Sequence, residues 1–165
     1  MKTTVTCADW LTAACQTALD LATHALGCAG EIGDQVPPPF AALAGAYIPL
    51  SGDAGAAGAI TVGLLAGETG CRALAGALLG VGDRATLSAS DVADAVSEIV
   101  NMLAGGIKSR MLSRMPPIFL GLPMFLHGWI EPGERIEVAA QSVRIGRIDT
   151  VVLVLRQRPG VARST

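Results

Sequence analysis

Apolar side chains recur three and four positions apart in three stretches of the chain, which is the spacing of a helix that buries one face. In the first stretch the pattern is carried by Trp10, Ala14 and Ala18. The third stretch is the longest and keeps its apolar stripe throughout. We therefore predict helices over residues 8–26, 68–80 and 90–114.

Capping residues mark the ends of these helices. Asp9 can cap the first helix, and Ser88 or Ser90 can cap the longest one, because short polar side chains accept hydrogen bonds from the free N–H groups of a first turn. Gly27 and Gly80 follow the first two helices, and glycine readily adopts the left-handed conformation that ends a helix. A Pro-Pro pair after the longest helix cannot continue it.

Alternating apolar and polar positions predict strands. Ile60, Val62 and Leu64 alternate with Thr and Gly, which is the period of a strand buried on one face. The glycine-rich segment before them lacks the Gly-Lys-Ser/Thr of a phosphate-binding loop, so we interpret it as a hairpin turn. Residues 27–45 are expected to form a loop that is extended at residues 37–39. The predicted strands are residues 45–52, 58–67, 118–130, 134–145 and 149–158.

The order of elements predicts the fold class. One helix, two strands, two helices and three strands favour an α/β chain of the α+β type with a mostly antiparallel sheet. A length of 165 residues suits one domain with a substantial core. We assign residues 1–158 to that domain and the polar residues 159–165 to a flexible tail.

Composition and charge exclude several classes of protein. The net charge is −2 and there is no basic stripe, so a nucleic-acid partner is not expected. The four cysteines form no Cys-x-x-Cys pair and have no ligand-like spacing with the two histidines, so we expect buried free thiols in a reducing compartment and no metal site. The most apolar stretch, residues 118–130, is too short to span a bilayer, so no membrane partner and a cytoplasmic location are expected.

The longest predicted helix has two different faces. Successive residues turn by about 100°, which separates an apolar stripe from a polar one. The apolar stripe is expected to pack on the sheet and contains Val92, Ala95, Val96, Ile99, Leu103 and Ile107. The outward stripe contains Asp94, Glu98, Asn101, Gly105 and Lys108.

The middle of this helix contains residues that form helices poorly. Each glycine costs about 1 kcal/mol relative to alanine. A polar pair such as Glu98 and Asn101 is most simply part of a solvated face. However, a glycine on the outward stripe, Gly105, lets another surface approach closely, which favours a partner. Gly106 lies nearer the apolar side and can let the helix sit close to the sheet.

The segment DAVSEIVNMLAGGIKSRM resembles the conserved helix of the CheX/CheC/FliY family of chemotaxis phosphatases. That family carries a Glu-x-x-Asn pair, then Met/Ile-x-x-Gly and a Lys. The resemblance covers residues 45–157, and the first helix lacks a second Glu-x-x-Asn pair, so one site is expected, as in the CheX branch. The matching positions are Glu98, Asn101, Met102, Gly105 and Lys108.

The resemblance implies a CheC-like fold and a homodimer joined through sheet edges. It also implies a hydrolase that removes the phosphoryl group from the phosphoaspartate of a CheY-type response regulator, with Mg²⁺ held by the regulator and no cofactor bound by this chain. Asn101 would position the attacking water, and Glu98 would pair with the active-site lysine of the regulator. Gly105 would give clearance, while Asp94 and Lys108 would be further contacts with the partner.

Two other interpretations stay open. In the first, the chain is a non-catalytic module of the same fold that docks on a response regulator or a motor-switch component. In the second, it is an unrelated α/β domain with a coincidental motif, and Asn101 then lies in the core or the sheet lacks two covering helices. His127 is interpreted as a packing or edge residue, and Ser97 has no neighbouring base that would make it a nucleophile.

Overall fold

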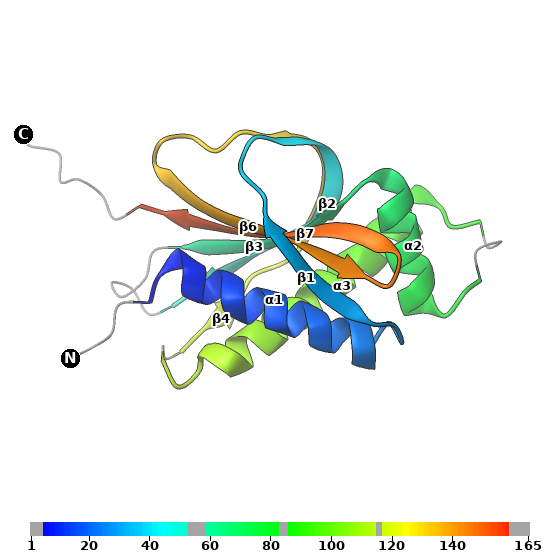
Figure 1. Cartoon of the computed structure of the whole chain (residues 1–165), viewed down its shortest axis with the longest axis horizontal. Coiled ribbons are helices and arrows are strands. Elements are labelled where there is room, and N and C mark those ends of the chain that lie inside the picture. The colour runs from blue at the N-terminus through cyan, green and yellow to red at the C-terminus, as the bar shows by residue number, and fades with distance from the viewer. Residues whose placement is uncertain (1–4, 53–58, 83–85, 115–116, 159–165) are drawn as a thin grey trace, which may run out of the picture.

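The computed structural model describes residues 5–52, 59–82, 86–114 and 117–158. The predicted tail, residues 159–165, and most of the predicted hairpin turn lie outside the described residues. Within them, three helices pack on one antiparallel sheet, so the predicted fold class is confirmed (Figure 1). The helices are α1 (Cys7–His24), α2 (Glu68–Leu79) and α3 (Ala89–Met111).

The sheet has seven strands in the order β1-β6-β7-β3-β2-β4, and β5 also pairs with β2. Every pairing is antiparallel. The short β4 and the longer β5 follow one another along β2, and together they form the edge opposite β1. The strands are β1 (Gly30–Gln35), β2 (Phe40–Ser51), β3 (Ile60–Ala66), β4 (Phe119–Leu120), β5 (Met124–Ile130), β6 (Ile136–Ile145) and β7 (Ile148–Gln157).

The helices cover one face of the sheet. α1 packs over β6 and β7, whereas α3 packs over β2 and against α1. The predicted apolar stripe of α3 is buried, with Val96, Leu103 and Ile107 fully enclosed in the main core. The opposite face carries a smaller core around Tyr47 and Leu153. Burial of the stripe orients α3 so that its polar stripe faces outward.

The predicted loop over residues 27–45 is wrong, because β1 and the start of β2 lie within it. β1 has the sequence GEIGDQ and is almost entirely exposed, so it shows no alternating pattern. It is held by β6 instead: Gln141 Nε2 donates to the carbonyl of Gly33 at 2.8 Å, and Ser142 Oγ donates to that of Asp34 at 3.0 Å. These contacts come from residues more than a hundred positions away, where local sequence gives no signal.

The helix boundaries differ from the prediction by a few residues. Thr6, not Asp9, is the N-cap of α1; Asp9 lies three positions on and closes a capping box with it. α1 ends at His24, two residues before the predicted end. Ser88 is the N-cap of α3, one of the two predicted candidates, and α3 ends at Met111 instead of 114.

The predicted strand over residues 118–130 is two strands, β4 and β5, separated by residues 121–123. Pro123 lacks the N–H that a continuous ladder with β2 needs. All four cysteines are free, as predicted; Cys28 alone among them is only half-buried. In the part of the chain described, no helix is long and apolar enough to cross a membrane.

Candidate functional site

The candidate site is the outward face of α3, and the start of this helix is well defined. Ser88 Oγ accepts the backbone N–H of Asp91 at 3.1 Å, while a carboxylate oxygen of Asp91 accepts the backbone N–H of Ser88 at 2.9 Å. These reciprocal hydrogen bonds form a capping box. Hydrogen bonds from Ser88 lower the pKa of the Asp91 carboxyl, so this carboxyl is ionised at neutral pH. A rigid first turn fixes the direction in which the next turns point their side chains.

The predicted outward residues lie on the solvent side of α3. Asp94, Glu98 and Asn101 are exposed, and Gly105 and Lys108 are half-buried. Among the described residues, neither the side chain of Glu98 nor that of Asn101 takes part in a hydrogen bond or an ion pair. Their polar atoms are therefore available to an external molecule.

The two adjacent glycines of α3 have different surroundings. A Cβ added to Gly105 would meet no described atom within 4 Å outside its own helix backbone, so packing among the described residues does not require a glycine there. A Cβ added to Gly106 would lie 2.3 Å from Cγ2 of Thr17, which belongs to α1. Gly106 thus permits close approach of α1 and α3. The sequence-based expectation that it permits approach to the sheet is wrong.

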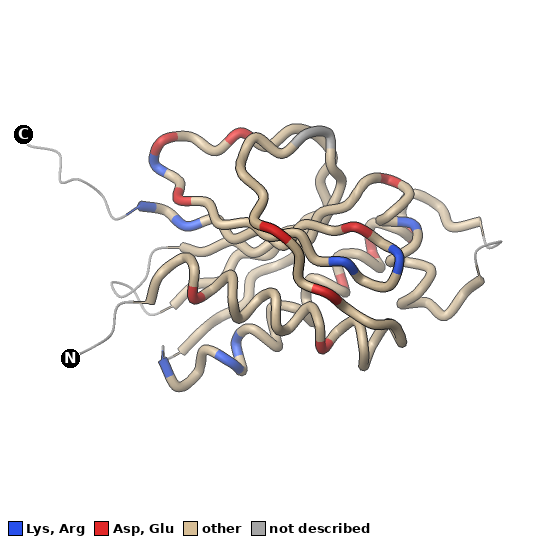
Figure 2. The backbone as a smooth tube through the Cα atoms, in the orientation of Figure 1, with Lys and Arg blue, Asp and Glu red and all other residues tan. Residues whose placement is uncertain are grey.

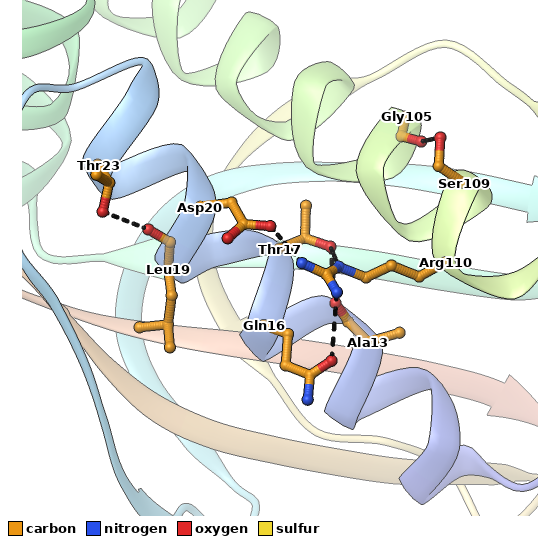
Figure 3. A network of polar contacts seen from close by, with 9 residues as sticks. All are labelled: Ala13, Gln16, Thr17, Leu19, Asp20, Thr23, Gly105, Ser109 and Arg110. Carbon is orange, nitrogen blue, oxygen red and sulfur yellow. Dashed lines mark hydrogen bonds and ion pairs between the residues drawn. The ribbon is translucent and has the colours of Figure 1, made fainter.

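Beside Gly106, Arg110 joins the two helices in a polar network that sequence reasoning missed (Figure 3). Its guanidinium donates from Nε to Thr17 Oγ1 at 3.1 Å and from Nη1 to Gln16 Oε1 at 3.4 Å, and it pairs with Asp20. The spacing of Gln16 and Asp20, one turn apart on α1, is the signal that could have indicated a shared partner. The network ties α3 to α1 on the side of α3 that faces away from Asn101.

The outward face continues beyond the predicted residues. Leu112 caps α3 in line with Gly105 and has an exposed fraction of 52%. Basic residues also gather at this end of the helix (Figure 2). The face therefore runs from acidic, at Asp94, through an acid–amide pair to an apolar and basic end.

The site is the solvent-exposed side of a packed helix, and it carries an acid and an amide one turn apart. A convex surface of this kind cannot enclose a small substrate, so it suits a reacting group that a partner presents in its own cleft. His127 lies on β5, where its ring meets Phe125 edge to face at a centroid distance of 5.1 Å, in agreement with an edge or packing role. Among the described residues, no three His, Cys, Asp or Glu side chains come together as metal ligands.

Comparison with protein families identifies one match. The family model described as chemotaxis phosphatase CheX matches residues 45–142, more than half of the chain, and this range includes all five predicted site residues. The interpretation as an unrelated domain with a coincidental motif is therefore wrong. Comparison with curated proteins finds no significant match.

Solved structures share the fold. A CheX from Desulfovibrio desulfuricans is 18% identical, with a TM-score of 0.68 over 88% of this chain and 94% of that one. A putative chemotaxis protein from Desulfovibrio vulgaris Hildenborough is 14% identical, with a TM-score of 0.72 over 88% and 95%. A chain of the CheX–CheY–BeF₃–Mg²⁺ complex from Borrelia burgdorferi is 14% identical, with a TM-score of 0.66 over 91% and 96%.

Proposed function

This chain belongs to the CheX family of chemotaxis phosphatases, and we propose that it hydrolyses the phosphoaspartate of a CheY-type response regulator through Glu98 and Asn101. One observation carries the proposal: both side chains are exposed one turn apart on a firmly packed helix, and neither has a described partner within the chain. The likeness to a chain of a CheX–CheY complex supports a regulator as the partner.

Asn101 positions the attacking water. An aspartyl phosphate is already activated, and the Mg²⁺ and lysine of the regulator neutralise its phosphoryl oxygens. The remaining task is to hold a water in line with the bond that breaks, which is catalysis by orientation. A neutral amide can accept a hydrogen bond from the water and donate one to a phosphoryl oxygen. A carboxylate at this position would repel the phosphoryl group, so Asn101→Asp is expected to be inactive.

Glu98 directs docking. It lies one turn before Asn101, so both side chains reach the same region of a partner. Its carboxylate pairs with the active-site lysine of the regulator, and docking removes water from the pair. Truncating one partner of such a desolvated pair should therefore cost more than losing an exposed salt bridge, which is worth about 0–1 kcal/mol.

The rest of the outward face completes the surface that meets the regulator. Gly105 gives room for a loop of the regulator, since none of the described residues places an atom within 4 Å of the position that its Cβ would take. Asp94 and Lys108 add charged contacts on either side of the working pair, and the exposed Leu112 adds an apolar contact at the end of the helix. We expect Mg²⁺ to be bound by the regulator.

The test is the rate of phosphate release from a phosphorylated CheY-type regulator with Mg²⁺. The wild-type chain should accelerate release, and Asn101→Ala should reduce the acceleration about a hundredfold, which is a typical loss when a positioning group is removed. Ser90→Ala is the matched control, since Ser90 is exposed on the same helix but lies about three turns before Asn101. Equal acceleration by wild type and Asn101→Ala would contradict the role of Asn101.

Binding to a regulator held in its active state by beryllofluoride separates chemistry from docking. Asn101→Ala should bind nearly as well as the wild type, whereas Glu98→Ala should bind more weakly. If the wild type binds but leaves the decay rate unchanged, the chain is a binding module without turnover.

We further propose a homodimer through the edge formed by β4 and β5. Strands at the edge of a sheet carry backbone groups that can pair with another chain. Within the described residues, β5 pairs with β2 on one side and with no strand on the other. This edge also carries large apolar side chains in contact with solvent, which is unusual for a free surface. They are Phe119, Leu122, Met124, Leu126 and Trp129, with exposed fractions of 55%, 84%, 55%, 49% and 60%.

A further inference from the structure

A second candidate site lies away from the outward face of α3. A cavity of about 610 Å³ opens where α2 meets the segment after α1 and the turn between β6 and β7. This volume is in the range of small-molecule sites, which span roughly 300–1,000 Å³. Its floor is apolar and includes Leu26, Leu87, Ile145 and Ile148.

The charged residues that the described part of the chain places around this cavity are of one sign. Arg72 from α2 and Arg147 from the β6–β7 turn both line it, and none of the residues that the structure places around it is acidic. Three further cavities each include a glutamate: Glu68 in one and Glu131 in the other two.

The two arginines are free to bind an anion. Arg72 is held in place by one hydrogen bond, from Nη1 to the carbonyl of Leu87 at 2.9 Å, which leaves its other N–H groups available. Among the described residues, neither Arg72 nor Arg147 forms an ion pair. By contrast, Arg144 on the same hairpin lies 3.2 Å from Asp149 and 3.8 Å from Glu31.

We propose that this cavity binds a small organic anion with an apolar body. The planar guanidinium donates two parallel hydrogen bonds to a carboxylate, and such bonds are stronger than those between neutral groups. The apolar part of the ligand then covers the isoleucine and leucine floor. Neither part alone accounts for both features of the cavity. An inorganic anion would leave the apolar floor in contact with water, and a neutral hydrocarbon would give neither of the two exposed guanidinium groups an anion to pair with.

The reactivity of Cys28, which lines the cavity, can be used to detect a ligand bound there. This half-buried thiol lines the cavity, whereas Cys7, Cys15 and Cys71 are buried elsewhere in the core. Burial raises the pKa of Cys28 and also raises the pKa of each of these three thiols, to about 11, so exposure decides which thiol a reagent reaches first. Modification by N-ethylmaleimide, a neutral reagent, should therefore occur first at Cys28. A ligand in the cavity should slow it.

The experiment follows modification of Cys28 by peptide mass spectrometry, with octanoate as the anionic probe and octanol as its neutral match. Octanoate at about four times its dissociation constant should slow modification about fivefold, because the unoccupied fraction falls as 1/(1 + [L]/Kd). Octanol at the same concentrations should protect far less. The full-length chain is used throughout.

Two variants and a control test the arginines. Arg72→Gln and Arg147→Gln should each raise the octanoate concentration needed for half-protection about tenfold, as expected for the loss of a charge-assisted hydrogen bond. Arg144→Gln should leave protection unchanged, since Arg144 does not line the cavity. Modification rates without octanoate, compared between the variants, report whether the cavity itself is intact.

Two results would overturn the proposal. Equal protection by octanol and octanoate would mean that the cavity selects apolar surface and not charge. Unchanged octanoate protection in both Arg72→Gln and Arg147→Gln would mean that the anion is bound elsewhere. Both results are independent of the phosphatase activity, so they do not bear on the function proposed for α3.

Discussion

At the scale of single residues, the adjacent glycines Gly105 and Gly106 have different roles. Gly106 is required by the chain itself, because Thr17 of α1 occupies the space where a side chain would lie. No described residue occupies the space where a side chain of Gly105 would lie. Packing among the described residues therefore does not explain why the helix carries a glycine there, although glycine destabilises a helix. That contrast supports the proposal that Gly105 is kept for contact with a partner.

Alanine at each position should separate the two roles. Gly105→Ala should stabilise the chain by about 1 kcal/mol through helix propensity, yet reduce dephosphorylation of the regulator because the new methyl group obstructs docking. Gly106→Ala should destabilise the chain, since overpacking a buried contact costs about 1–3 kcal/mol. Urea unfolding and phosphate release measure the two effects. Full activity in a stabilised Gly105→Ala variant would remove the support for a docking role.

The residues of the site were predictable to different degrees. Helical periodicity alone placed Glu98, Asn101 and Asp94 on the exposed face, since burial of one stripe determines the direction of the other. The roles of these residues rest on resemblance to a family and stay predictions. The spacing of Gln16 and Asp20 could have indicated a shared partner, but it did not identify Arg110, which lies on another helix about ninety positions away in the sequence.

At the scale of elements, α1 and α3 have the same type of N-terminal cap. Each starts with a capping box in which a hydroxyl and an aspartate satisfy one another's backbone N–H groups. In α1, hydrogen bonds from Thr6 and from Arg114 lower the pKa of the Asp9 carboxyl from 3.8 to about 2. The guanidinium of Arg114, just beyond α3, lies 2.9 Å from Asp9, so this box also ties the start of α1 to the end of α3.

The stability that Asp9 contributes should depend on pH. Its pKa is lower in the folded chain, so the contribution is fully present above the unfolded value of 3.8 and is lost as the pH falls towards 2. Asp9→Asn should therefore be less stable than the wild type at pH 6, and the difference should shrink between pH 4 and pH 2. Urea unfolding across this range measures it. Asp94→Asn, which removes an exposed carboxylate outside the capping boxes, is the control. A stability difference between the wild type and Asp9→Asn that does not change with pH would contradict the role assigned to the Asp9 carboxylate.

At the scale of the whole molecule, the two edges of the sheet differ. The β1 edge is polar and exposed, with the sequence GEIGDQ, whereas the β4–β5 edge is apolar. Natural proteins protect edge strands with charges or prolines, and an unprotected apolar edge favours pairing with another chain. The asymmetry between the edges is the reason for proposing one dimer interface, through β5, instead of an open-ended array.

A lysine on the β5 edge should disrupt the proposed dimer. Leu126→Lys places a charge among the apolar side chains of the interface and should shift the chain to monomer at concentrations where the wild type is a dimer. Leu79→Lys is the matched control, because Leu79 is exposed to a similar degree, 50% against 49%, but lies on α2. Sedimentation equilibrium measures the mass. A wild type that is monomeric at every concentration would refute the interface.

The sequence by itself determined what depends on short-range periodicity: three helices, the strands around residues 60 and 150, and the outward face of α3. These features are local, because neighbouring residues decide which face an element buries. The tertiary structure decided what depends on distant partners. β1 exists because β6 holds it, Gly106 is needed because Thr17 lies opposite, and the arginine-lined cavity forms where three separate segments meet. Contacts between residues far apart in the chain create these features, and no local pattern encodes them.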